Sequence, residues 1–220
     1  MKFFSARFVI VAAGIATWES AMAQTTIPLV DVRAVDPTIV VELRYADVNN
    51  FSKHALYPPG TSALVRPEVA RRLAAAQAFL RRHQYQLKIW DAYRPRSVQL
   101  RLWQLARNTD YVADPRSGAG SLHCWGVAVD ATLIDLANNP VNMPTDFDDF
   151  TPAAIWRYQG IDPGIRAHLR LLQAAMGGAG FCAMRTEWWH FVVADWRKYL
   201  PPEDSTRTAQ TFGTRWQAKL

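Results

Sequence analysis

Three stretches of the chain carry apolar residues at every third or fourth position, which is the spacing of one face of an α-helix. The clearest runs from Pro67 to His83, where a proline suits the first turn. Its apolar stripe consists of Val69, Leu73, Ala76, Phe79 and Leu80. Residues 97–106 and 163–176 show the same periodicity, and a glycine-rich segment ends the last stretch. The pattern therefore predicts three helices.

Between these stretches the pattern changes to short runs of the β type. Apolar and polar residues alternate over 40–45 and 86–90, so that Tyr45 shares one face of the first run with two apolar residues. Residues 128–133 form a mostly apolar run, and residues 181–194 are rich in aromatic residues and valine. We expect an α+β fold: a single domain with a small antiparallel sheet flanked by helices.

The N-terminus has the pattern of a secretory signal peptide. Lys2 and Arg7 precede a short apolar core, and Ala21-Met22-Ala23 is a small-x-small cleavage site. The apolar core is too short to span a bilayer, although an uncleaved anchor is the alternative. We expect a signal peptide at 1–23, a folded domain at 24–200 and a peripheral tail at 201–220.

Export implies an oxidising compartment, most simply a bacterial periplasm, and nothing after residue 24 predicts stable membrane insertion. The formal net charge is +6, from 25 basic and 19 acidic side chains. The arginines are scattered, and no basic run is interleaved with aromatic residues, so we expect no nucleic-acid partner. Nothing in the sequence indicates an oligomeric state.

The chain has two cysteines, Cys124 and Cys182, and each lies next to a segment with candidate site residues. In an oxidising compartment such a pair can form a disulfide, and two free buried thiols are the equal alternative. The two cysteines form no Cys-x-x-Cys motif, which argues against a redox protein.

The candidate chemistry is concentrated in two segments, 121–130 and 187–190. They supply His123, Asp130 and His190 as candidate metal ligands, together with Glu187. A catalytic zinc site needs three protein ligands, an open position for water and a carboxylate that moves protons. The sequence therefore predicts a zinc site on the sheet, and with it a zinc peptidase.

The spacing of these residues sets a structural condition. His123 and Asp130 are seven residues apart, and in one regular strand they would point to opposite faces, about 23 Å apart. If they share an ion, the chain must bend between them, and Gly126 is the natural place. Glu187 and His190, three apart, share a face of a helix but not of a regular strand. A loop histidine at 123 and a core histidine at 190 are the alternatives.

Four motifs in order resemble the D-alanyl-D-alanine dipeptidases, the zinc peptidases of the vancomycin-resistance type. The family pattern Ser-x-His-x-x-Gly-x-Ala-x-Asp matches residues 121–130, and Glu-Trp-Trp-His matches residues 187–190. Upstream, Tyr-Ala and Asn-Phe match at 45–46 and 50–51, and Trp-Asp-x-Tyr-Arg-Pro matches at 90–95. The resemblance covers roughly residues 40 to 200, and it makes 24–200 a zinc dipeptidase domain.

This resemblance implies a role for each matched residue. His123, Asp130 and His190 would be the ligands of one Zn²⁺, and Glu187 the catalytic base. Arg94 would stabilise the charge that develops on the scissile carbonyl. The substrate-binding residues would be Ser121, Tyr45 and Asp148, the last at the amino end of a small dipeptide, with Asp146 and Asp149 as competitors for that role.

Trp125 departs from the small or basic residue that the family pattern favours there, so we expect it to reshape the mouth of the pocket. The predicted function is zinc-dependent hydrolysis of D-Ala-D-Ala in the cell envelope. Two alternatives remain: a zinc D,D- or L,D-carboxypeptidase acting on peptidoglycan stem peptides, and a non-catalytic module that binds cell-wall peptides.

Overall fold

The computed structural model describes residues 28–106, 111–116 and 118–200. The expected signal peptide at 1–23 and the expected tail at 201–220 lie outside the described residues. Among the helices of the described part, none is both long enough and apolar enough to cross a membrane.

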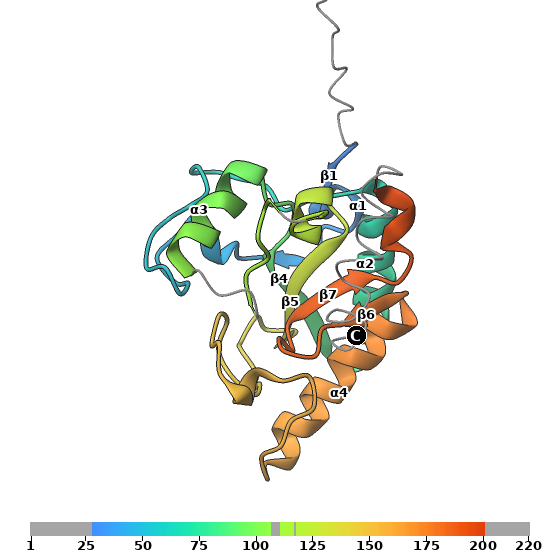
Figure 1. Cartoon of the computed structure of the whole chain (residues 1–220). Helices are drawn as coiled ribbons and strands as arrows, with labels where there is room; N and C mark the ends of the chain where they lie inside the picture. Colours follow the sequence, from blue (N-terminus) through green and yellow to red (C-terminus); the bar gives the residue numbers. More distant parts are fainter. Residues whose placement is uncertain (1–27, 107–110, 117, 201–220) are drawn as a thin grey trace, which may run out of the picture.

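The centre of the fold is a five-stranded mixed sheet (Figure 1). Its strands, in spatial order, are β2 (Val40–Val41), β4 (Tyr85–Asp91), β5 (Ala128–Asp135), β7 (His190–Val193) and β6 (Phe181–Ala183). β2 runs parallel to β4, while the other neighbours are antiparallel. The expectation of a small antiparallel sheet holds for three of the four strand pairs, and the parallel β2–β4 pair makes the sheet mixed. The chain passes through a helix between β2 and β4, and such a crossover allows parallel pairing.

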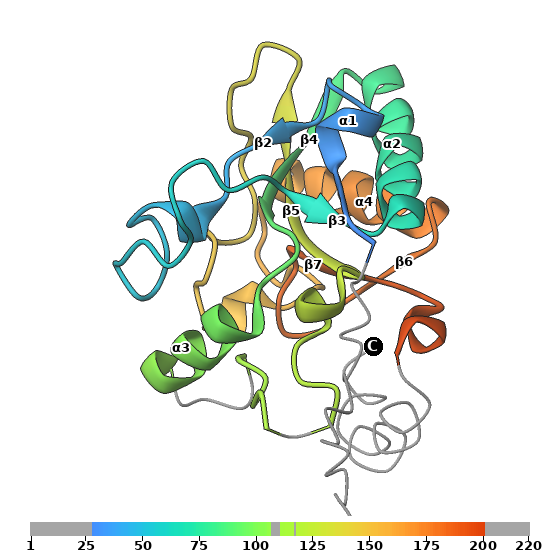
Figure 2. The same ribbon diagram turned by 90° about the horizontal axis from the view of Figure 1, so that it is seen from above.

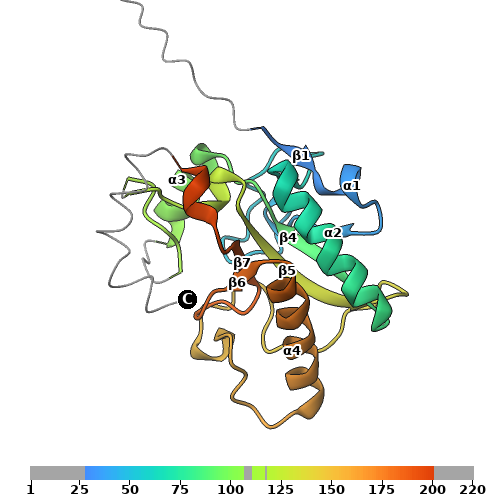
Figure 3. The same cartoon turned by 90° about the vertical axis from the view of Figure 1, so that its right-hand side faces the viewer.

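A second, two-stranded antiparallel sheet joins β1 (Val30–Asp31) to β3 (Leu64–Val65). The α-helices are α1 (Val32–Val35), α2 (Pro67–Arg82), α3 (Arg96–Ala106) and α4 (Pro163–Gly178). Helices α2 and α4 lie along one side of the large sheet and α3 lies on the other side (Figures 1 and 3). The α+β class and the three predicted long helices are confirmed.

Helix α2 illustrates why the periodicity identified these helices so well. Pro67 occupies the first turn, where its missing N–H leaves no bond unmade. Four residues of the predicted stripe are fully buried: Val69, Leu73, Ala76 and Leu80. Burying one leucine stabilises the fold by roughly 1.5–3 kcal/mol. The repeat of buried side chains therefore fixes which face of α2 meets the sheet.

The predicted strand at 40–45 is shorter than expected. Only Val40 and Val41 pair with β4, and Arg44–Ala46 form a 3₁₀ turn, η1. The carbonyl of Tyr45 accepts bonds from the backbone N–H groups of Leu56 and Tyr57, at 2.7 and 2.9 Å. The backbone at Leu56 and Tyr57 thus takes the place of a neighbouring strand, and the Tyr45 side chain is buried.

The aromatic stretch at 181–194 forms two strands instead of one. β6 and β7 pair with each other, so that Phe181 lies opposite Val193. The backbone N–H of His190 donates to the carbonyl of Glu187 at 3.1 Å, in the turn that enters β7. Glu187 is therefore in a turn and His190 begins a strand. The two residues do not share a single helix or a single strand, so their three-residue separation does not place them on opposite faces of one strand.

Candidate active site

The chain bends at Gly126, as the spacing of His123 and Asp130 required. His123 lies in a short 3₁₀ helix, η2 (Leu122–Trp125), and Gly126 follows it with φ +67°. A side chain at Gly126 would also place its Cβ 2.7 Å from the Leu29 side chain. Both the left-handed backbone and the close approach favour glycine. After the bend, β5 carries Asp130 back toward the histidine.

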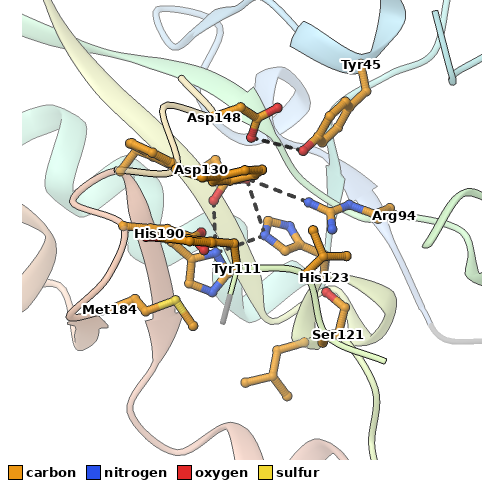
Figure 4. A pocket seen from close by; sticks show the side chains of 15 residues that line it. Tyr45, Arg94, Tyr111, Ser121, His123, Asp130, Asp148, Met184 and His190 are labelled. Atoms are coloured by element: carbon orange, nitrogen blue, oxygen red, sulfur yellow. Dashed lines mark hydrogen bonds and ion pairs between the residues drawn. The ribbon is translucent and has the colours of Figure 1, made fainter. Parts of the chain in front are cut away.

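Asp130 and His190 are cross-strand neighbours on β5 and β7. Asp130 Oδ1 lies 2.9 Å from His190 Nδ1, and Asp130 Oδ2 lies 3.5 Å from His123 Nε2. His123 Nε2 lies 3.1 Å from His190 Nδ1. Three residues from three elements thus converge on one point (Figure 4), and all three are buried.

Neighbouring groups prepare these side chains to bind a metal. His123 Nδ1 lies 2.8 Å from the carbonyl of Ala92, which can only accept, so Nδ1 carries the proton and Nε2 keeps its lone pair. Burial lowers the pKa of His190, which favours the neutral ring that metals require. Burial alone would raise the pKa of Asp130, but the adjacent histidines hold it below its usual range, as a carboxylate.

The three ligand atoms match the size of a tetrahedral zinc site. Ligands 2.0–2.1 Å from a tetrahedral ion lie about 3.3 Å from one another. His123 Nε2 and His190 Nδ1 are 3.1 Å apart, His190 Nδ1 lies 2.9 Å from Asp130 Oδ1, and His123 Nε2 lies 3.5 Å from the other oxygen, Oδ2. With one ligand atom from each residue, the three atoms all lie within 4.8 Å of one another. Two imidazoles and one carboxylate are also a donor set that zinc accepts. The cluster therefore fits a divalent metal of this kind.

Arg94 is held beside the cluster by a buried network. Its Nε and Nη2 donate to Asp91 Oδ2 at 3.0 and 2.7 Å, and Nη1 donates to Gln99 Oε1 at 2.7 Å. Its Nη2 lies 3.8 Å from Asp130 Oδ2. Burial opposes the charge of Arg94, but Asp91, Tyr45, Tyr57 and Asp130 together outweigh it, and the pKa of Arg94 rises above its usual range. The guanidinium is thus cationic and fixed in place.

Asp148 lies at another end of the same pocket. It has φ +58°, and its carboxylate accepts bonds from the Tyr45 hydroxyl and the Phe51 backbone N–H, each at 3.2 Å. Burial raises the pKa of Asp148 to about 7, and the Asp130 carboxylate contributes to the rise. Asp146 instead faces outward, 3.5 Å from Arg44, and Asp149 does not line the pocket. Of the three candidates, only Asp148 is in the pocket lining.

Eight of the sequence-predicted residues line this one pocket. They are Tyr45, Arg94, Ser121, His123, Asp130, Asp148, Glu187 and His190. In Figure 4, Asp148 and Tyr45 lie on one side of the cluster of His123, Asp130 and His190, and Ser121 lies on the opposite side. Glu187 is 7% exposed, so a carboxylate borders the cluster in a largely dry setting.

Among the predicted substrate-binding residues, Trp125 is absent from the pocket lining. Its indole Nε1 donates to the carbonyl of Ala119 at 2.8 Å, and the Arg96 guanidinium lies 5.1 Å from the ring centroid. These contacts anchor the ring next to the bend at Gly126. The structure therefore gives Trp125 a packing role and does not support the expected contact at the pocket mouth.

The pocket also contains residues that sequence reasoning missed, namely Tyr111, Val112, Ala113, Leu122, Phe150, Met184 and Trp189. Asp91, which holds Arg94, was part of a recognised motif but received no role. A carboxylate at the end of an apolar strand, three residues before an arginine, was the available signal. Tyr111 follows a polar stretch of sequence and gave no comparable signal.

The two cysteines are free thiols in the structure, so the disulfide is not formed there. Cys124 is 5% exposed, and burial raises the pKa of its thiol to about 11. A thiol with that pKa stays protonated near neutral pH and is a poor nucleophile. Cys124 therefore serves as a small apolar core residue beside His123.

Comparison with known proteins gives a consistent result. The family model described as D-ala-D-ala dipeptidase matches residues 25–205. A D-alanyl-D-alanine dipeptidase of Escherichia coli K12 is 33% identical over 178 residues, which is 81% of this chain and 90% of that protein. The enzyme of that name from Enterococcus faecium is 26% identical over 172 residues, which is 70% of this chain and 85% of that protein.

The family match spans most of the chain, including every residue of the pocket. It also agrees with the buried cluster of two histidines and one aspartate, a donor set expected in a metallopeptidase. The chain therefore belongs to the D-Ala-D-Ala dipeptidase family of metallopeptidases, and it is a peptidase.

Proposed function

We propose that this protein is a zinc-dependent dipeptidase that hydrolyses D-Ala-D-Ala in the cell envelope. The observation that carries the proposal is the convergence of His123, Asp130 and His190 in a pocket that Glu187 and Arg94 also line. The dipeptidases named above are relatives of this chain over most of their length, which supports the substrate class.

His123 Nε2, His190 Nδ1 and the Asp130 carboxylate would hold the ion. The chemistry that a bound zinc supplies is Lewis acidity, which lowers the pKa of water and polarises a carbonyl oxygen. The protein supplies the setting for this chemistry, because burial leaves the cluster with little competing solvent. Three protein ligands also leave a fourth position open for water or substrate.

Glu187 is the group that moves the proton. It accepts a proton from the water that attacks the scissile carbonyl, and it returns that proton to the amine of the leaving D-alanine. The reaction consumes one water and yields two D-alanine molecules. The backbone bond from His190 N–H to the Glu187 carbonyl closes the turn before β7, so the base and one ligand come from the same short segment.

Arg94 stabilises the negative charge that develops on the carbonyl oxygen during attack. Asp91 and Gln99 hold its guanidinium in place before substrate arrives, so little reorganisation is needed during the reaction. Replacing such a group typically costs about 3 kcal/mol of barrier.

The pocket is polar at both ends, as a dipeptide zwitterion requires. Asp148 pairs with the substrate ammonium, assisted by the Tyr45 hydroxyl that already bonds the carboxylate. Ser121, on the opposite side of the cluster in Figure 4, helps to position the remainder of the substrate. A dipeptide lying between them presents its peptide bond to the cluster.

The cell-envelope setting rests on the N-terminal sequence. Lys2 and Arg7, the apolar core and the site at Ala21–Ala23 support export. A periplasmic dipeptidase of this specificity would recover D-alanine from cell-wall fragments. The enzyme should then occur in the periplasmic fraction without its first 23 residues, and N-terminal sequencing of the secreted protein checks this.

The decisive experiment is a panel of the four alanyl-alanine stereoisomers, assayed with the zinc-loaded protein and after chelation. We expect hydrolysis of D-Ala-D-Ala only with zinc, and much weaker hydrolysis of the L-containing isomers. A stem peptide ending in D-Ala-D-Ala, assayed in parallel, tests the carboxypeptidase alternative. Preference for that peptide, or activity that survives complete metal removal, would contradict the proposal.

A further inference from the structure

Three aromatic rings pack against one another at the pocket, and two of them belong to its lining. The ring centroids of Tyr111 and Phe150 are 4.7 Å apart and the rings are nearly parallel, at 20°. The Phe150 centroid is in turn 5.3 Å from that of Phe51. Tyr111 and Phe150 line the pocket, while Phe51 supports Phe150. We call these three residues the aromatic row.

The aromatic row adjoins the carboxylate that would receive the substrate amine. Phe150 follows Asp148 by two residues, and the backbone N–H of Phe51 donates to Asp148 Oδ2 at 3.2 Å. Two of the three rings therefore belong to the segments that hold Asp148. Tyr111 comes from a different loop and reaches the pocket that contains His123 (Figure 4).

We propose that Tyr111 and Phe150 limit the substrate to two residues, by closing the space beyond its amine. This inference rests on the proposed function, because it takes Asp148 as the ammonium site. One further residue at the amino end needs roughly 3.5 Å of additional chain. Tyr111 and Phe150 both line this pocket, and the Phe51 ring packs against Phe150 with the centroids 5.3 Å apart.

Tyr111 and Phe150 can limit substrate length because their stacked rings form a stiff part of the pocket lining. An aromatic ring has few rotatable bonds, and a stacked pair is stabilised by roughly 0.5–1.5 kcal/mol beyond its burial. A longer substrate would have to break the stack before it could bind. Tyr111 and Phe150 are thus specificity-determining residues, and the test must separate a length effect from a general loss of structure.

The experiment uses the zinc-loaded variants Tyr111→Ala, Phe150→Ala and the double variant. The matched control is Phe79→Ala, which removes an aromatic ring from α2, where Phe79 stacks on His83. The kcat/KM values are measured for D-Ala-D-Ala and for Gly-D-Ala-D-Ala, whose last bond is the same. We expect the preference for the dipeptide to fall by about tenfold or more in the double variant and to stay unchanged in the control.

Calorimetry measures the binding of both peptides without turnover. The protein is zinc-loaded Glu187→Gln, with and without the two alanine substitutions. Absence of D-Ala-D-Ala hydrolysis by the wild type would refute the proposed function, while tripeptide binding gained only with the alanine substitutions would still support the length limit. Equal handling of both peptides by the wild type would overturn the inference. So would an unchanged preference in the double variant, or binding of neither peptide by any variant.

Discussion

Asp130 lies directly opposite His190 across the β5–β7 pair, with Oδ1 2.9 Å from Nδ1. Directly opposed residues on antiparallel strands share one face of the sheet, with their Cβ atoms about 5 Å apart. Two of the three candidate ligands are therefore set by strand register alone. Only His123 must be brought in by a loop, and the bend at Gly126 does so.

Removal of one ligand should release the metal. We expect His190→Ala to lose zinc, because two remaining ligands on a site built for three hold the ion far more weakly. Elemental analysis of the purified protein measures the zinc content. The control is His83→Ala, an exposed histidine at the end of α2. Full zinc occupancy in His190→Ala would contradict the ligand assignment.

Loss of the proposed base should separate metal binding from catalysis. Glu187→Gln keeps nearly the same shape but cannot take up a proton, so kcat should fall by roughly 10²–10⁴-fold with zinc retained. Steady-state kinetics together with zinc analysis tests this. Glu68→Gln, on α2, is the matched control and should retain activity. An active Glu187→Gln enzyme would exclude Glu187 as the base.

Replacing Arg94 by lysine should keep a positive charge but lose the geometry. The guanidinium group of Arg94 donates to Asp91 and to Gln99 at the same time, and a single ammonium group cannot reproduce this geometry. We expect kcat to fall by about 10²–10³-fold. Arg82→Lys, on the exposed end of α2, should have wild-type kinetics. A change confined to KM would show that Arg94 acts in ground-state binding.

The ammonium site should make substrate affinity depend on pH. Burial raises the pKa of Asp148 to about 7, so below that pH the free enzyme carries a neutral carboxyl that pairs poorly with an ammonium. KM should therefore fall as pH rises through 7. In Asp148→Asn, KM should be higher and this pH dependence should disappear. The same pH profile in the variant would refute the assignment.

The same carboxyl should also affect stability. Its pKa in the folded state lies above the usual 3.8, so the folded state holds this proton more tightly than the unfolded state. The contribution of Asp148 to stability is thus present below pH 4 and is lost as pH rises through 7. Thermal unfolding should show Asp148→Asn gaining stability relative to wild type between pH 5 and pH 8.

The buried thiol of Cys124 should resist alkylation. Burial raises its pKa to about 11, so almost no thiolate exists at pH 8. Mass spectrometry after iodoacetamide treatment should find Cys124 unmodified in the native protein and both cysteines modified after unfolding. Rapid native labelling of Cys124, or a peptide that links it to Cys182, would contradict the structure.

Local sequence patterns were enough to predict the periodic elements and the candidate chemistry of the site. The stripe of α2 and the apolar run of β5 follow from local spacing, because each element buries one repeating set of side chains. A candidate site residue can also be recognised from its immediate neighbours in the sequence. Asp130, for example, is a carboxylate inside an otherwise apolar strand. The need for a bend at Gly126 followed from spacing alone.

How these parts meet depends on tertiary contacts. The parallel pairing of β2 with β4, the turn that separates Glu187 from His190, and the choice of Asp148 over Asp146 all depend on partners distant in sequence. The contacts that keep Trp125 out of the pocket lining depend on Ala119 and Arg96. Local patterns record which face of a segment is buried. Register and side-chain direction are set by non-local contacts, which leave no periodic signal in the chain.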